Sequence, residues 1–269
     1  MTPSAIREAA LRWQAAAQPA TVVEVLAARG SVPRDAGTRM LVAAHQVLGT
    51  IGGGHLELQA INTARELLAR GGAAQEQAVA LGPSLGQCCG GAITLRYTAL
   101  ADCDPQHWQM PTALFDLQLY GAGHVGRAIV HLLRGIDCRV RWIDEREDEF
   151  PSGPLPAHIE QVCAEPVQAE VACAAPCGFY LVLTHSHELD LAISQAILAR
   201  GDFGFFGLIG SQTKRARFEH RLTDRGVPAE LLARMVCPIG LPGLPGKQPE
   251  VLAVSVVAQL LMQPGAARR

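Results

Sequence analysis

One glycine-rich segment in the second half of the chain constrains the fold more than any other feature. Gly121, Gly123 and Gly126 have G-x-G-x-x-G spacing within LQLYGAGHVGRAIVHLLRG (117–135), between an apolar strand pattern and a helical pattern. The first glycine permits a tight turn, the second lets a phosphate approach the backbone, and the third lets helix and strand pack closely. Asp144 ends the next expected strand, where a carboxylate can accept hydrogen bonds from ribose hydroxyls. The segment therefore predicts a Rossmann-like unit.

The segments around this fingerprint alternate between strand and helix patterns. Strands are expected over 115–120, 138–143, 179–184 and 205–209, and helices over 124–134, 187–200 and 211–223. Strands separated by helices indicate a parallel sheet covered on both faces. We therefore expect residues 115–269 to form a doubly wound, Rossmann-like α/β domain.

The carboxyl ends of the expected strands carry further polar residues. Ligands bind at these ends in parallel sheets, so residues 184–187, Gly210 and Ser211 are expected to share one crevice with Gly121. His185 and His187 could form part of a metal or acid–base site. Ordinary loop histidines are the simpler interpretation, because zinc sites normally assemble three or four ligands.

The first half of the chain has a different pattern. Helices are expected over 4–17 and 55–70, and strands over 21–28, 40–44, 47–51, 77–81 and 91–100. A chain of 269 residues exceeds the usual size of one domain. We expect a small α/β or α+β domain over residues 1–103, followed by a linker over 104–114, where the sequence lacks periodicity and contains two prolines.

Three glycine-rich elements dominate this first domain: GSVPRDAGTRM (30–40), GTIGGGHLE (49–57) and GPSLGQCCGG (82–91). Glycines let a ligand approach the main chain, where amide groups can form an anion-binding nest. Arg34 and Arg39 supply positive charge suited to phosphate or to a molybdate-like oxyanion. His55 and Glu57 stand at the start of an expected helix, whose N-terminus favours anions. Ordinary turns are the alternative for any single element.

Two of the eight cysteines, Cys88 and Cys89, are neighbours in the third element. Their α-carbons are about 3.8 Å apart, below the roughly 4.4 Å that a relaxed disulfide needs. A disulfide between them is therefore improbable, and the pair could be buried apolar side chains, metal ligands or reactive thiols. For the other six we expect plain burial or incidental exposure: Cys103, Cys138, Cys163, Cys173, Cys177 and Cys237.

Composition excludes several classes of function. The formal net charge of −2 gives no electrostatic reason to expect nucleic acid, whose binding depends on clustered basic residues. The N-terminal residues MTPSAIREAALRWQ show no signal peptide, and the apolar stretch 251–262 is too short to cross a bilayer. We expect a soluble cytoplasmic protein that does not bind membranes and whose thiols stay reduced.

Eight short motifs together resemble those of the xanthine dehydrogenase accessory protein family: GSVPRDAGTRM, GTIGGGHLE, GQCCGG, LYGAGHVG, IDERED, THSHELD, GLIGSQTKR and CPIGL. The resemblance implies a molybdenum-cofactor chaperone rather than an enzyme. Such a protein binds molybdopterin, protects it while a cysteine desulfurase installs the sulfido ligand, and delivers it to apo-xanthine dehydrogenase, an enzyme of purine catabolism. One departure is Gln248, where the family usually has threonine; Pro249 can still open the last helix.

The resemblance also gives the cysteine pair a chemical role. Thiolate is a soft ligand and can carry sulfur as a persulfide, so Cys88 and Cys89 are the candidate metal ligands, with Gln87 beside them. The resemblance implies that the rest of the cofactor pocket consists of Arg34, Asp35, Arg39, Gly52, Gly53, Gly54, His55 and Glu57. The fingerprint residues Gly121, Gly123, Gly126 and Asp144 are candidates for a bound nucleotide. A homodimer is expected, because twofold pairs are the commonest soluble assembly.

Two other functions compete with this interpretation. An NAD(P)-dependent oxidoreductase would use the Gly121 loop and one of His124, His185 or His187 for proton transfer, since histidine titrates near neutral pH. A zinc-dependent thiol protein would use Cys88, Cys89 and His55, but adjacent cysteines depart from the two-residue spacing typical of structural zinc sites.

Overall fold

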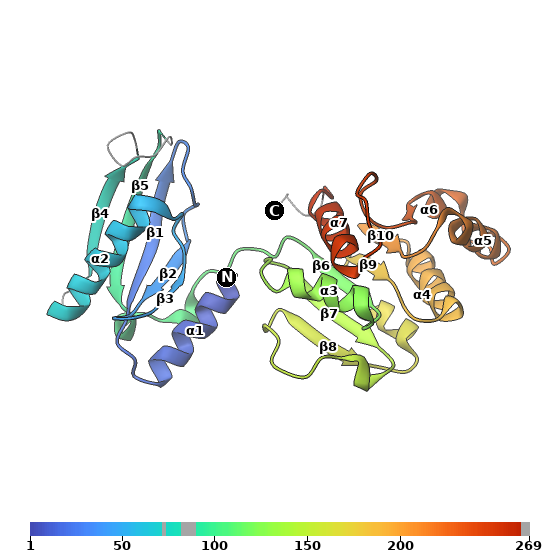
Figure 1. The fold of residues 1–269 in the computed structure, drawn as a ribbon, viewed down its shortest axis with the longest axis horizontal. Helices are drawn as coiled ribbons and strands as arrows, with labels where there is room; N and C mark the ends of the chain where they lie inside the picture. The colour runs from blue at the N-terminus through green and yellow to red at the C-terminus, as the bar shows by residue number, and fades with distance from the viewer. Residues whose placement is uncertain (72–73, 82–89, 265–269) are drawn as a thin grey trace. The chain divides into compact units, whose positions relative to one another are not determined.

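The chain forms two compact units, Met1–Pro111 and Thr112–Arg269 (Figure 1). The computed structural model describes residues 1–71, 74–81 and 90–264. The boundary falls inside the expected linker 104–114, but most of that segment belongs to the first unit. The 3₁₀ turn η3 (Pro105–His107) contacts helix α1 (Pro3–Ala15), and Trp108 packs against the apolar cluster around that helix. The connection between the units is therefore shorter than expected.

The first unit is built on a five-stranded antiparallel sheet with strand order β3-β2-β1-β5-β4. Its strands are β1 (Thr21–Arg29), β2 (Arg39–Val42), β3 (Val47–Gly49), β4 (Gln75–Ala80) and β5 (Ala92–Ala99). Helix α2 (Gly54–Arg70) covers the face that carries Val23 and Val25, and α1 covers the face that carries Val22. Successive side chains of a strand point to opposite faces, so the valine run of β1 serves both helices.

The second unit contains a six-stranded parallel sheet with strand order β11-β10-β9-β6-β7-β8. Its strands are β6 (Asp116–Tyr120), β7 (Arg139–Asp144), β8 (Ile159–Cys163), β9 (Phe179–Val182), β10 (Phe205–Leu208) and β11 (Met235–Val236). Numbered from β6, this is the 3-2-1-4-5-6 order of a dinucleotide-binding Rossmann fold. The predicted doubly wound sheet is confirmed.

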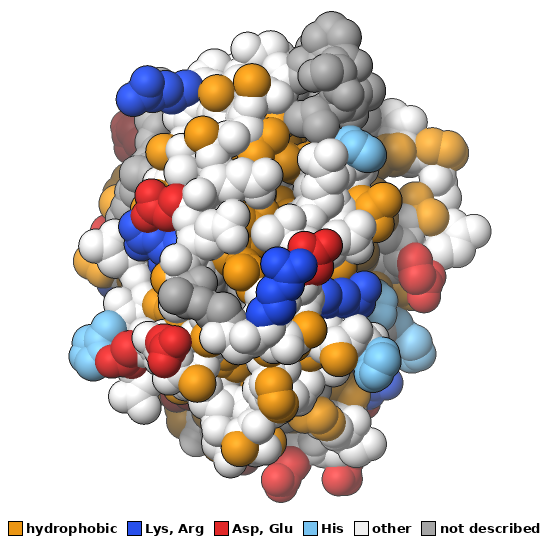
Figure 2. Space-filling model, turned by 90° about the vertical axis from the view of Figure 1, so that its left-hand side faces the viewer, with side chains coloured by type: hydrophobic (Ala, Val, Ile, Leu, Met, Phe, Trp, Pro, Cys, Tyr) orange, Lys and Arg blue, Asp and Glu red, His pale blue; other side chains and the backbone are white. Residues whose placement is uncertain are grey.

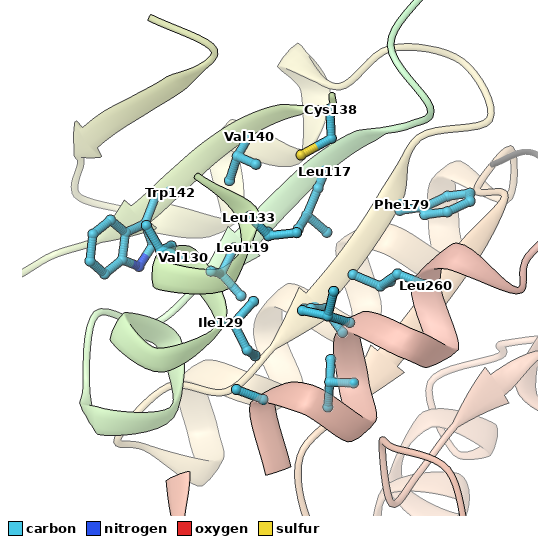
Figure 3. Packing of buried hydrophobic residues seen from close by; sticks show 14 of the residues in the cluster. Leu117, Leu119, Ile129, Val130, Leu133, Cys138, Val140, Trp142, Phe179 and Leu260 are labelled. Atoms are coloured by element: carbon cyan, nitrogen blue, oxygen red, sulfur yellow. The ribbon is translucent and has the colours of Figure 1, made fainter. Parts of the chain in front are cut away.

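Helices cover both faces of this parallel sheet. They are α3 (His124–Leu133), α4 (His187–Arg200), α5 (Gln212–Thr223), α6 (Ala229–Ala233) and α7 (Pro249–Leu261). On one face, Leu117 and Leu119 of β6 pack with Ile129 of α3 and Leu260 of α7 (Figure 3). On the other face, Tyr120 joins a second cluster with α4, α5 and α6. A proline in the first turn opens α7, as expected from its fixed backbone angle.

The surface carries charges of both signs. On the face drawn in Figure 2, basic and acidic side chains are interspersed with apolar ones. Among residues 1–71, 74–81 and 90–264, no helix combines the length and the hydropathy that a membrane span requires.

The six described cysteines differ in exposure. Cys138 and Cys237 are buried, Cys103 is half-buried, and Cys163, Cys173 and Cys177 are exposed. Burial raises the pKa of Cys138 to about 12, and burial together with nearby Asp102 raises the pKa of Cys103 to about 11. Because only the thiolate is a strong nucleophile, these two thiols are unreactive near neutral pH.

Alkylation with iodoacetamide at about pH 8, where an unperturbed thiol is partly ionised, is expected to separate the two groups. Peptide mass spectrometry should find Cys163, Cys173 and Cys177 modified quickly in the native protein. Cys103 and Cys138 should react only after unfolding, because their pKa values lie well above that pH. Rapid native modification of Cys138 would contradict the packing of the first Rossmann helix over β6 and β7.

Candidate functional site

The three glycine-rich elements of the first unit meet in space. A Cβ added to Gly52 would lie 2.5 Å from Cβ of Pro33, and one added to Gly91 would lie 2.5 Å from the carbonyl oxygen of Ser31. Gly30 also approaches Gly91, since its added Cβ would lie 3.2 Å from that residue's Cα. Segment 30–40 therefore contacts both segment 49–57 and the described end of segment 82–91.

Glu57 orders the loop between β3 and α2. Its Oε2 accepts hydrogen bonds from the hydroxyl of Thr50, from the amide of Ile51 at 3.0 Å and from the amide of Gly53 at 3.1 Å. The loop also needs glycine, because Gly52 and Gly53 have φ of 127° and 77°. The sequence predicted Glu57 as part of the pocket wall. In the structure its carboxylate holds the loop backbone in place by accepting hydrogen bonds from amides that precede the helix.

His55 and Gly54 lie at the first turn of α2. His55 is exposed, and its Nε2 lies 3.0 Å from Nε2 of Gln59. Gly54 has φ of 67°, so three consecutive glycines have positive φ angles, which other residues rarely adopt. This conformation turns the chain from β3 into the helix.

A cavity of about 430 Å³ lies in the first unit beside this loop. Arg34, Asp35 and Arg39 line it, together with Thr50 and Trp108. The structure thus brings the two predicted arginines and Asp35 to one cavity. Trp108 is an addition, because the sequence places it in a stretch expected to be a linker.

The two arginines of the cavity have different surroundings. Nη2 of Arg39 lies 2.5 Å from Oε1 of Glu24, and its guanidinium carbon lies 4.7 Å from the centre of the Trp108 ring. This pairing and stacking fix Arg39 in place. Arg34 is exposed and makes no ion pair within the described part of the chain. Arg34 is therefore the guanidinium that is free to meet an anion.

The predicted residues Gln87, Cys88 and Cys89 lie outside the described residues. The described ends of their loop are held together, because the amide of Leu81 donates to the carbonyl of Gly91 at 2.8 Å. Gly91 in turn contacts segment 30–40, which carries Arg34. The described ends of the loop that carries the cysteines therefore lie next to segment 30–40.

The dinucleotide fingerprint of the second unit has the expected geometry. Gly121 has φ of 121°, and an added Cβ would lie 2.4 Å from the carbonyl oxygen of Leu183. A Cβ on Gly126 would lie 2.1 Å from the carbonyl oxygen of Gly121. A Cβ on Gly123 would meet nothing within 4 Å. The first and third glycines are required by backbone contacts, and the second leaves room for a ligand.

Asp144 ends β7 as predicted, but its carboxylate already has partners. Oδ2 accepts from the amide of Ala122 at 2.7 Å and from Nη2 of Arg146 at 3.0 Å. Oδ1 accepts from the amide and from Nε of Arg146, both at 3.0 Å. Burial alone would raise the pKa of Asp144, but the hydrogen bonds from Arg146 and Ala122 outweigh it and hold that pKa below the usual value.

The carboxyl ends of β9 and β10 are joined by a buried ion pair that the sequence did not predict. Nζ of Lys214 lies 2.5 Å from Oδ2 of Asp190 and donates to the carbonyl of Ile209 at 2.8 Å. The amide and the hydroxyl of Thr184 donate to Oδ1 of Asp190 at 3.0 and 2.7 Å. Asp190 belongs to the motif THSHELD and Lys214 to the motif GLIGSQTKR. These two motifs were the signal in the sequence that could have indicated the pair.

The histidines after β9 do not assemble a metal site. Nε2 of His185 lies 3.6 Å from Oε1 of Glu145, and His187 is exposed at the start of α4. Over the residues described here, no group of three or more histidine, cysteine or acidic side chains is arranged to hold a metal ion.

Comparisons with known proteins agree with this two-part architecture. A profile of the XdhC Rossmann domain matches residues 117–260, more than half of the chain, and a profile of the XdhC and CoxI family matches residues 13–78. A protein of Bacillus halodurans, whose crystal structure is described as that of a xanthine dehydrogenase, has a TM-score of 0.74 at 18% identity, covering 100% of this chain and 97% of its own.

A curated relative is the uncharacterized protein YqeB of Escherichia coli strain K12, which is 30% identical over 258 residues. The match covers 90% of this chain but 43% of that protein, so the chain spans less than half the length of this relative. The motifs, the strand order and the two profile matches lead to one assignment. The chain belongs to the XdhC and CoxI family.

Proposed function

We propose that this protein is an accessory factor in xanthine dehydrogenase maturation that binds the molybdenum cofactor, supports its sulfuration and delivers it to the apoenzyme. The observation that carries the proposal is a cavity lined by Arg34 and Arg39 of segment 30–40, which contacts both other glycine-rich elements. Family membership supports the same role. A binding protein of this kind needs no turnover, and we propose no enzymatic activity for it.

The cavity suits a phosphorylated heterocycle. Its volume of about 430 Å³ falls within the range of small-molecule sites. A guanidinium can hold two phosphate oxygens at once, and Arg34 is placed at the cavity with its charge unpaired among the described residues. The Trp108 ring adds an aromatic wall, and the Arg39 guanidinium stacks on that ring. The molybdopterin phosphate is the group we assign to Arg34.

The molybdenum end of the cofactor calls for soft ligands. We propose Cys88 and Cys89 as that ligand pair, with Gln87 as their polar neighbour, on the chemistry of the sequence. Gly91 anchors the described end of their loop beside Ser31, three residues from Arg34. That one cofactor is bound by both the arginine and the thiols is part of the proposal.

Molybdenum retention tests the proposal. The purified protein is incubated with molybdopterin cofactor, desalted and analysed for molybdenum. The Cys88→Ser, Cys89→Ser double variant is expected to retain far less metal, and Arg34→Ala about tenfold less, because a charge-assisted hydrogen bond is worth about 1.5–3 kcal/mol. Arg70→Ala, at the exposed end of α2, is the matched control and should retain as much as the wild type. Equal retention by all four proteins would exclude the site.

The proposed partners are the xanthine dehydrogenase apoenzyme, a cysteine desulfurase and a second copy of the chain. Light scattering measures the last of these directly, and co-purification of the two enzymes with the wild-type chain measures the others. A monomer across the micromolar range would exclude the homodimer.

An NAD(P)-dependent oxidoreductase is the second candidate function. The observation that favours it is the geometry of Gly121, Gly123 and Gly126, which matches a dinucleotide fingerprint. The surroundings of Asp144 oppose it, because this carboxylate is already hydrogen bonded within the chain.

A further inference from the structure

The ribose end of a Rossmann crevice is defined by one carboxylate. In NAD-binding members of this fold, the acid at the end of the second strand accepts hydrogen bonds from the hydroxyls of the adenosine ribose. Asp144 occupies that position at the end of β7. A ribose can bind there only if the carboxylate has acceptor sites that face the crevice.

Asp144 has no such site to spare. A carboxylate offers about four lone-pair positions, and Asp144 accepts four hydrogen bonds, one from Ala122 and three from Arg146. The residue is 4% exposed, so water does not compete for it. The residues present therefore do not fit the ribose of NAD.

Arg146 is itself held in place. Its Nη1 lies 3.2 Å from Oε1 of Glu149, and Glu149 is bound on its other side by Arg127 of α3, whose Nε donates to the Glu149 carbonyl at 3.0 Å. The chain Asp144–Arg146–Glu149–Arg127 thus links the loop after β7 to the helix that follows the fingerprint. Arg146 is one member of a network, so displacing it requires more than rotating a free side chain.

An arginine near this position can instead accommodate the 2′-phosphate of NADP. The local charge opposes that role here. Residues 144–149 carry five carboxylates and one guanidinium. Three of the guanidinium's donors already serve Asp144 and Glu149. A phosphate dianion at this loop would meet mostly negative charge.

A second contact crosses the diphosphate position. Glu145 follows β7 and His185 follows β9, and β6 lies between these two strands in the sheet. Their contact at 3.6 Å therefore spans the carboxyl end of β6, where the Gly121 loop begins. Both side chains are partly exposed, so this pair is a minor obstacle beside the occupied Asp144.

We propose that Arg146 serves as an internal occupant of the ribose site and is the residue that excludes NAD from the Rossmann unit. The fold is retained, whereas the acceptor on which dinucleotide recognition depends is used within the chain. This inference concerns the second unit and does not depend on molybdenum binding by the first.

Calorimetric titration of NAD⁺ into the full chain tests the proposal. The wild type is expected to bind no tighter than millimolar, and Arg146→Ala is expected to bind at least about tenfold tighter, because freed carboxylate oxygens accept charge-assisted hydrogen bonds from the ribose. The gain should vanish in the Asp144→Ala, Arg146→Ala double variant. Arg139→Ala, which breaks an arginine–aspartate pair at the other end of β7, is the matched control and should behave as the wild type.

Several outcomes would overturn the proposal. Micromolar NAD⁺ binding by the wild type would do so whether or not any variant folds. So would equal or absent binding in the wild type and Arg146→Ala, with Arg146→Met as a second variant that keeps most of the side-chain volume. NADP⁺ bound by the wild type tenfold tighter than NAD⁺ would assign Arg146 to a 2′-phosphate instead.

Discussion

Replacing Gly126 by alanine is expected to destabilise the second unit by about 3 kcal/mol or more, the upper range for forcing extra atoms into a packed site. The added Cβ would lie 2.1 Å from the carbonyl oxygen of Gly121 and 3.1 Å from its carbonyl carbon. Both are backbone atoms at the end of β6, so they cannot rotate aside as a side chain can. Helix α3 would have to move away from the strand and lose its packing on Leu117 and Leu119.

Gly123→Ala is the matched control for this substitution. An alanine Cβ at Gly123 would meet nothing within 4 Å, and its φ of −70° suits any residue. The expected cost is below about 1 kcal/mol, from the poorer N-cap that alanine provides. Urea denaturation combined with hydrogen-exchange mass spectrometry reports each unit separately. If both variants lost equal protection over β6 and β7, close backbone approach would not be the reason for glycine at Gly126.

Local signals in the sequence were sufficient for most of the second unit. The glycine spacing and the alternation of apolar strands with helices depend on neighbouring residues, and they predicted four of its strands and three of its helices. Strand β8 was missed because it lies at the edge of the sheet, where Glu160 and Gln161 are exposed and break the apolar pattern. Strand β11 has two residues, too few for any periodicity.

Tertiary contacts explain what the sequence could not supply in the first unit. Its strands were predicted locally, but the pairing of Thr21 with Ala99 joins segments far apart in the chain. Trp108 stands in a stretch without periodicity and next to prolines, which is typical of a linker. Its position depends on Arg39 and on the cluster around α1, both distant in sequence.

For the candidate site, the sequence predicted where the residues stand but not which partners they bind. The sequence predicted that Glu57 and Asp144 stand at ligand-facing positions, and both do stand at those loops. It could not show that each carboxylate is already hydrogen bonded within the chain, because the donors come from turns whose geometry only the fold determines. Glycine roles were easier to predict, since a missing side chain has one main structural use at a strand end.

Replacing Lys214 by methionine is expected to destabilise the second unit by about 3–5 kcal/mol, the range for removing one partner of a buried ion pair. The side chains of Asp190 and Lys214 are 1% and 11% exposed, so neither charge is solvated when the other is lost. Methionine keeps the stem that packs on Gly210 and removes only the ammonium. Thr184 would still donate to Asp190, but no cation would remain to balance the carboxylate.

Two comparisons show whether burial of the charge is the cause. The Asp190→Asn, Lys214→Met double variant should recover much of the lost stability, because it leaves no uncompensated charge. Glu188→Gln breaks an ion pair with Arg221 that joins the same two helices at the surface, and it should change stability far less because water solvates both groups. Urea midpoints and hydrogen-exchange protection of α4 and α5 measure all three variants. A Lys214→Met cost no larger than that of Glu188→Gln would mean that the pair at the ends of β9 and β10 is not isolated from solvent.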